Sequence, residues 1–351
     1  MIINMKLFEA VDDFFALDIG STSLNVVQLH KSAIGWSLEK VGTMTVDMKI
    51  TSSDAPEHKQ KLSEMIMNLV SQTGITTKNV VLGIPSNKMF ATVVNMPEVP
   101  ASDLATAVRY QAEQYVPMSL DEAKIDWAVL GKLPTDPTLN EVLLVSVENA
   151  YTEARLDMLE NIGLNVIALE PDSIAVIRSL VDTSDTSNNI IIRFGDNTTD
   201  IIVVSTGAPK LVRALPTGFQ TMVRALQQNL NIDEGQATQF VTKFGLSPDK
   251  LEGKVMQALE NVVEQFMSEV SKSAKFFDGK YPGIPISTVI LTDAGLSVPG
   301  FAQHITDKTG LSVVSGNPWS RVNVSQADQQ KIQDISATFA VCVGLAMRNE
   351  R

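Results

Sequence analysis

Residues 15–27 read FALDIGSTSLNVV, and this stretch predicts two short strands joined by a tight turn. Its apolar run ends at a glycine and resumes at Val26, which is typical of a β-hairpin. The turn offers flexible backbone, N–H groups and hydroxyls, the chemistry of an anion cradle, through Gly20, Ser21, Thr22 and Ser23. Asp18 precedes the turn, where a carboxylate could hold a hydrated divalent metal ion. Taken alone, this stretch is better explained as an ordinary hairpin in which Ser and Thr satisfy the turn.

A second stretch has the same plan. Residues 189–204 read NIIIRFGDNTTDIIVV, again an apolar run, a glycine, a hydroxyl-rich bend, an aspartate and another apolar run. The polar positions of this second bend are Gly195, Asn197, Thr198, Thr199 and Asp200. Two such hairpins predict a duplicated architecture whose halves present their bends to one shared cleft.

The pair of hairpins resembles the two phosphate loops of the actin-like ATPase superfamily and, within it, the PilM family of type IV pilus assembly proteins. The resemblance extends along the chain, and the order and spacing of the matching segments make it specific. These segments are residues 107–127, 168–171, 269–277, 289–300, 308–311 and 317–319.

Composition sets the outer limits on function. A chain of 351 residues, 44% of them hydrophobic, is long enough for two lobes. Its net charge of −12 argues against nucleic-acid binding and against a polybasic membrane attachment. A single cysteine, Cys342, excludes an internal disulfide, and no zinc-binding pattern is present. We find neither a signal peptide nor an apolar stretch of about 20 residues, so we expect a cytoplasmic protein without direct membrane insertion.

The resemblance implies an α/β fold with a duplicated, ribonuclease H-like core, two lobes and an inserted subdomain called 1C. We expect the first core (1A) in residues 1–86, the 1C subdomain in 87–165 and a crossing segment of 1A in 166–188. The second core (2A) is expected in residues 189–220 and 284–334, the outer subdomain (2B) in 221–283, and a closing helix on 1A in 335–351.

The resemblance also implies site residues for ATP and Mg²⁺. Asp18 and Asp200 would be the catalytic and metal-binding carboxylates. The two hairpin bends, with Arg193, would contact phosphates, whereas the base and ribose would be contacted by Glu269, Lys272, Ser273, Asp293 and Gly295. An exposed ion pair is the simpler reading of Glu269 and Lys272.

Four positions depart from the family pattern, and each touches phosphate, metal or base. Arg193 stands where an aspartate is usual, Asn25 where a lysine is usual, and Asp293 and Ala294 where two glycines are usual. A guanidinium disfavours Mg²⁺ and attracts a carboxylate, so we expect an internal ion pair of Arg193 with Asp18 or Asp200. ATP binding and turnover are therefore both left open by the sequence.

The leading functional prediction is a cytoplasmic adaptor of type IV pilus or related secretion machinery, in which the cleft is partly degenerate. The resemblance implies binding of the N-terminal peptide of a PilN-like membrane protein, which would recruit the chain to the inner face of the membrane, among other inner-membrane assembly proteins. The predicted groove lies between the first core and the 1C subdomain and involves Tyr110, Glu113, Gln114, Tyr115 and Val116. The alternatives are an active ATPase that regulates pilus assembly and an FtsA-like filament protein, and a homo-oligomer is also compatible with the sequence.

Overall fold

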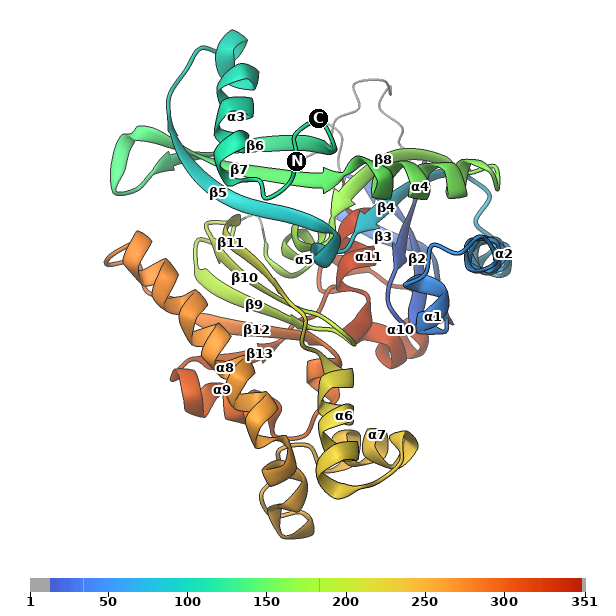
Figure 1. Cartoon of the computed structure of the whole chain (residues 1–351). Helices are drawn as coiled ribbons and strands as arrows, with labels where there is room; N and C mark the ends of the chain where they lie inside the picture. Colours follow the sequence, from blue (N-terminus) through green and yellow to red (C-terminus); the bar gives the residue numbers. More distant parts are fainter. Residues whose placement is uncertain (1–12, 34, 183, 349–351) are drawn as a thin grey trace. The chain divides into compact units, whose positions relative to one another are not determined.

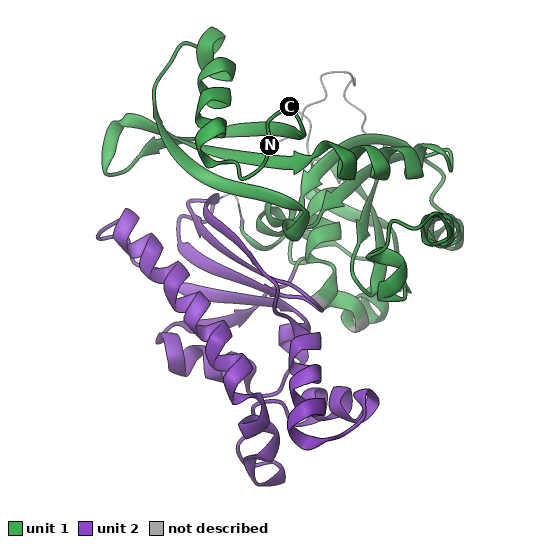
Figure 2. Cartoon of the chain, in the orientation of Figure 1, with its two compact units in different colours: residues 1–181, 318–351 green, residues 182–317 purple. Residues whose placement is uncertain are grey.

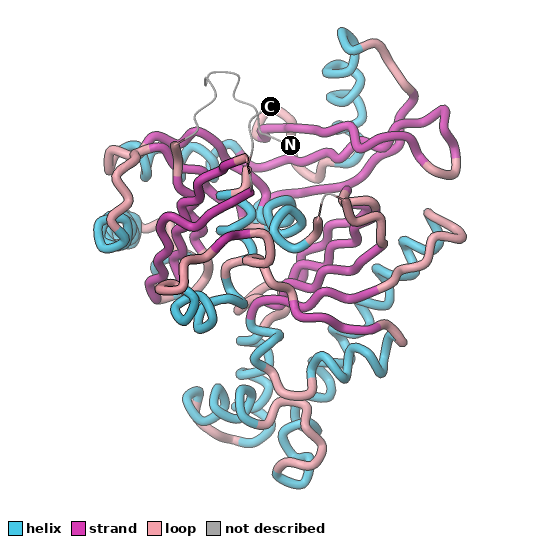
Figure 3. Tube along the Cα trace, turned by 180° about the vertical axis from the view of Figure 1, so that it is seen from behind, coloured by secondary structure: helices cyan, strands magenta, loops and turns pink. Residues whose placement is uncertain are grey.

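The computed structural model describes residues 13–33, 35–182 and 184–348. The chain divides into two compact units, one of residues 1–181 with 318–351 and one of residues 182–317 (Figure 2). Each unit is built on its own β-sheet, and helices lie beside the strands (Figures 1 and 3). The mixed α/β class predicted from the sequence is confirmed.

The first unit contains a six-stranded sheet of order β14-β3-β2-β1-β4-β8. Strands β1, β2 and β3 form an antiparallel meander, whereas β4 and β8 continue the sheet in parallel from β1. The strands are β1 Phe15–Ile19, β2 Ser23–Ser32, β3 Gly35–Thr45, β4 Asn79–Ile84, β8 Asn165–Pro171 and β14 Val322–Asn323. The helices of this sheet are α1 Met48–Thr51, α2 Pro56–Thr73, α4 Asn149–Glu160, α5 Asp172–Leu180, α10 Gln329–Ile335 and α11 Ala340–Ala346.

Local chemistry explains several of these boundaries. Helix α2 begins at Pro56, whose fixed φ suits the first helical turn, and ends before Gly74, which takes a left-handed φ of 69°. Helix α11 lies very close to α5. A Cβ at Gly344 would lie only 1.8 Å from the carbonyl oxygen of Ala175, so this position requires glycine. That close approach allows α11 to pack against α5 within the first unit.

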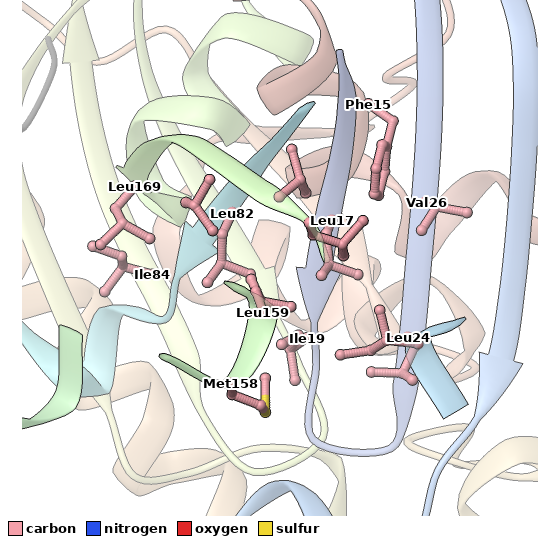
Figure 4. Packing of buried hydrophobic residues seen from close by; sticks show 14 of the residues in the cluster. Phe15, Leu17, Ile19, Leu24, Val26, Leu82, Ile84, Met158, Leu159 and Leu169 are labelled. Atoms are coloured by element: carbon pink, nitrogen blue, oxygen red, sulfur yellow. The ribbon is translucent and has the colours of Figure 1, made fainter. Parts of the chain in front are cut away.

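Alternation along β1 and β7 produces the core of the first unit. Phe15 and Leu17 on β1 are fully buried and belong to a cluster that also includes Leu24 and Leu82 (Figure 4). Burying one such side chain contributes roughly 1.5–3 kcal/mol. Strand β7 joins this cluster through Leu143, Val145 and Val147.

A separate three-stranded sheet of order β5-β7-β6 covers that core. Its elements are β5 Met89–Pro97, α3 Ala101–Tyr115, β6 Ala123–Leu133 and β7 Asp136–Glu148. The opposite face of β7 carries Val142 and Leu144, which form a second cluster with Val108 and Ala112 of α3. Residues 89–148 thus form a subdomain with its own small core.

The second unit repeats the strand plan of the first. Its five-stranded sheet has the order β11-β10-β9-β12-β13. This order matches β3-β2-β1-β4-β8 of the first sheet, both in the succession of strands along the chain and in their parallel or antiparallel directions. The strands are β9 Asn188–Phe194, β10 Thr199–Ser205, β11 Ala208–Leu215, β12 Thr288–Asp293 and β13 Ser312–Ser315. The helices are α6 Phe219–Leu230, α7 Glu234–Lys243, α8 Lys254–Lys280 and α9 Phe301–Thr309. The duplication predicted from the two hairpins is therefore present in the sheets.

One boundary differs from the prediction. Residues 318–334 were expected in the second core, but Val322 and Asn323 pair in parallel with β3 of the first sheet. A strand of two residues has no periodic pattern that sequence reasoning could have used. Within the described ranges, no helix is long and apolar enough to cross a membrane.

Candidate functional site

The first hairpin places a carboxylate opposite an amide. Asp18 on β1 faces Asn25 on β2, and the Asn25 amide donates a hydrogen bond of 3.2 Å to Asp18 Oδ2. Thr43 in turn donates to the Asn25 side-chain oxygen at 2.8 Å. At the bend, the Gly20 N–H donates to the Ser23 carbonyl at 2.9 Å. The predicted residues 18–23 therefore lie together at one end of the first sheet.

A second carboxylate at this end of the sheet was not predicted. Asp172 begins α5, is 2% exposed, and leaves so little space that a Cβ at Gly83 would lie 2.5 Å from its Oδ1. Burial raises the pKa of the Cys342 thiol, and the charges of Asp18 and Asp172 raise it further. Both carboxylates therefore act on one buried group. Asp172 directly follows the family-like segment 168–171, and this position was the signal that could have identified it.

The second hairpin places a guanidinium at the position that corresponds to Asp18. Arg193 on β9 faces Asp200 on β10, and its Nε and Nη2 both lie 2.8 Å from Asp200 Oδ2. Its Nη1 lies 3.3 Å from Asp293 Oδ2. The bend closes as in the first hairpin, with the Gly195 N–H donating to the Thr198 carbonyl at 3.0 Å. The predicted ion pair of Arg193 with Asp200 is confirmed.

Asp293 ends β12 in an unusual backbone conformation. Its φ is +59°, in the left-handed region that favours glycine. Gly295, which was predicted to let a base approach the backbone, is buried, and a Cβ there would lie 2.8 Å from Leu291 Cδ1 and 3.0 Å from Phe194 Cβ. Gly295 therefore also has a packing reason to be glycine. Ala294 begins the short 3₁₀ helix that follows.

Two of the residues predicted to contact base or ribose, Glu269 and Lys272, lie beside an open hollow. Glu269 on α8 accepts hydrogen bonds from Lys272 at 2.6 Å and from Arg213 of β11 at 2.7 Å. These contacts, that with Lys272 foremost, lower the pKa of the Glu269 carboxyl. Ser273 is fully buried and donates to the Glu269 carbonyl at 2.9 Å. The hollow has a volume of about 400 Å³ and is lined by residues 215–217 and by α8, including Glu269 and Lys272.

The residues predicted for a partner groove lie on or directly after α3 and are placed differently from one another. Tyr110 and Tyr115 are 63% and 48% exposed, and Glu113 and Gln114 are also exposed. Val116 instead belongs to the apolar cluster under α3. Of the five, Tyr110 alone is among the lining residues of a hollow of about 460 Å³ between α3 and the end of β5.

This hollow is not the predicted groove between the first core and this subdomain, which stays a prediction. It lies within residues 96–111. Its walls include Met96 from the end of β5, Val99 from the segment that links β5 to α3, and Asp103 and Gln111 from α3. Sequence reasoning missed these residues because it gave no sign that the end of β5 lies beside α3.

The fit to Mg²⁺ differs between the two hairpins. In the first, Asp18 supplies a buried carboxylate of the kind that binds hydrated Mg²⁺. In the second, the corresponding position carries the Arg193 cation, which holds Asp200 and Asp293 itself. The residues of the second hairpin therefore do not fit a metal ion. Among the residues that the structure describes, no cluster of three or more His, Cys, Asp or Glu could hold one.

Comparison with protein families identifies the chain as a whole. The sequence profile described as type IV pilus assembly protein PilM matches residues 16–350. The chain belongs to the PilM family. The recognition made from the two hairpins and the distributed segments is thus confirmed.

Solved structures support the fold of this PilM family member. A chain of a PilM-PilN type IV pilus biogenesis complex matches with a TM-score of 0.83 and 21% identity, covering 97% of this chain and 99% of that one. The ethanolamine utilization protein EutJ from Carboxydothermus hydrogenoformans matches with a TM-score of 0.56 and 13% identity, covering 98% and 94% of the chains. MreB 5 of Spiroplasma citri bound to AMPPNP matches with a TM-score of 0.55 and 11% identity, covering 96% and 95%. The chain therefore has the actin-like ATPase fold, as predicted.

Proposed function

We propose that this chain is a type IV pilus assembly adaptor that binds the cytoplasmic N-terminal tail of a PilN-like membrane protein. The observation that carries the proposal is the family match over residues 16–350. The similarity to a chain of a PilM-PilN complex, which extends over 97% of this chain, supports the partner. Such a partner would recruit the chain to the inner face of the membrane and to other pilus assembly proteins.

The hollow between β5 and α3 is our proposed docking site for that tail. Its walls are mainly apolar, through Met96, Pro97 and Val99, and it has an exposed aromatic side chain, Tyr110, at its edge. Apolar grooves with an aromatic anchor and few polar contacts commonly bind extended or helical peptides.

Charge also favours this pairing. Cytoplasmic segments next to a membrane span carry an excess of Lys and Arg. The chain has a net charge of −12, and the hollow contributes the carboxylate of Asp103. Opposite charge raises the association rate and orients the peptide, so binding should weaken as salt is added.

Titration with a labelled peptide tests the site. The peptide is the cytoplasmic N-terminal tail of the PilN-like protein from the same organism, and binding is measured by fluorescence anisotropy. We expect Tyr110→Ala to weaken binding about tenfold or more and Asp103→Asn about threefold. Tyr115→Ala is the matched control, because this tyrosine is on the same helix but outside the hollow, and it should change affinity less than about twofold. If Tyr110→Ala and Asp103→Asn bind the peptide as tightly as the wild type and Tyr115→Ala do, the tail binds elsewhere.

A second candidate function is nucleotide-dependent regulation. The hollow of about 400 Å³ beside Glu269 and Lys272 favours it, because an adenosine group fits such a space and such polar groups. A neighbouring structure was solved with AMPPNP. The Arg193 ion pairs at the second hairpin oppose Mg²⁺ binding, so we infer that the cleft is partly degenerate and that tail binding does not require hydrolysis. Micromolar affinity for Mg-ATP together with steady phosphate release would instead support the ATPase.

A further inference from the structure

Three strand ends of the second unit meet at one guanidinium. Strand β9 lies between β10 and β12, and Arg193 is opposite Asp200 on one side and Thr292 on the other. Asp293 is the next residue of β12. The Arg193 side chain therefore reaches a carboxylate on each neighbouring strand.

The two carboxylates depend on this cation because they are out of water. The Asp200 side chain is fully buried and that of Asp293 is 12% exposed, while Arg193 is 14% exposed. Buried carboxylates are strongly unfavourable unless they are paired with a cation or bind a metal ion. The second oxygen of Asp200 is also buried, and it has no hydrogen-bond partner in the described part of the chain. That oxygen could be a ligand in the absence of Arg193.

The backbone of β12 shows that the carboxylate of Asp293 is held at a cost. A residue with a side chain is strained relative to glycine at the φ of +59° and ψ of −144° that Asp293 adopts. The bond to Arg193 offsets this strain and fixes the carboxylate toward β9. The cluster is therefore a connected unit and not a surface ion pair.

We propose that Arg193 is a built-in cation that takes the place of a divalent metal ion at the second hairpin. It neutralises Asp200 and Asp293 and ties the ends of β9, β10 and β12 together without Mg²⁺. Removal of the guanidinium converts these two carboxylates into a site for one divalent ion, for which oxygen ligands are suited. This inference is independent of the partner tail.

Thermal unfolding of the full chain in EDTA and in millimolar MnCl₂ tests the proposal. We expect the wild-type melting temperature to differ by less than about 1 °C between the two buffers. Arg193→Ala should melt about 5–10 °C lower in EDTA, because two buried carboxylates lose their shared cation. Mn²⁺ should restore about half of that loss, with one ion bound per chain by electron paramagnetic resonance titration.

The double variant Arg193→Ala/Asp293→Ala is the control, since it has one carboxylate and should show no recovery in Mn²⁺. The proposal is overturned if the wild type is stabilised by Mn²⁺, if Arg193→Ala melts like the wild type, or if the double variant recovers equally. Should Arg193→Ala not fold in EDTA, its refolding yield decides: recovery only with Mn²⁺ supports the proposal, and failure in both buffers contradicts it.

Discussion

The two hairpins of this chain share a backbone but differ in charge. In both, a glycine N–H at the bend donates to the carbonyl three residues later, at 2.9 Å in the first and 3.0 Å in the second. The residue two positions before that glycine is Asp18 in one and Arg193 in the other. The first faces a neutral amide, whereas the second faces a carboxylate. Apolar alternation and the turn determine the hairpin, so the polar position beside the turn can change sign without changing the fold.

Reversal of charge at the second hairpin should have the largest effect. Arg193→Asp places a third carboxylate beside Asp200 and Asp293, and we expect a loss of unfolding free energy of about 5 kcal/mol or more. Arg193→Lys retains a cation and should lose much less. Urea unfolding measures both, and similar losses for the two variants would show that charge is not the determinant.

A second carboxylate at the first hairpin should have an intermediate effect. Asn25→Asp removes the hydrogen-bond donor to Asp18 and places a second carboxylate opposite it. The unfolding free energy should fall by about 2 kcal/mol at pH 7. The sign is defined, because protonation of one carboxyl relieves the repulsion and the loss should shrink as the pH falls toward 5. Urea unfolding at several pH values is the measurement, and a loss that grows at low pH would refute this account of the pair.

Substitution of the bend glycines should affect the two hairpins alike. A Cβ at Gly20 would lie 3.1 Å from the Ser23 carbonyl oxygen, and one at Gly195 would lie 2.9 Å from that of Thr198. We expect Gly20→Ala and Gly195→Ala each to cost about 1 kcal/mol in unfolding free energy. A large difference between the two would break the geometric equivalence of the bends.

The smallest effect is expected where two terms cancel. Asp293→Gly loses the bond to Arg193 but relieves the backbone strain at a φ of +59°. The partly buried bond to Arg193 and the backbone strain are each on the order of 1–3 kcal/mol and have opposite signs, so the net change in unfolding free energy should stay within roughly 0.5 kcal/mol. A loss above about 2 kcal/mol would mean that the ion pair outweighs the strain.

Local signals account for what the sequence could predict. Both hairpins, helix α2 and strand β4 follow from short-range patterns with clear glycine or proline boundaries. The pairing of Arg193 with Asp200 was also predictable, because the two residues are neighbours across one turn. Long-range contacts were not predictable. Asp293 is 100 residues from Arg193, and no local pattern indicates that contact.

A pair of double-mutant cycles, measured by urea unfolding, compares the hairpins most directly. One combines Arg193→Met with Asp200→Asn, and the other combines Asp18→Asn with Asn25→Ala. The account predicts a coupling energy of about 3 kcal/mol for the buried ion pair and about 1 kcal/mol for the amide–carboxylate pair. Equal couplings, or a coupling below about 0.5 kcal/mol at Arg193, would contradict a built-in cation at the second hairpin.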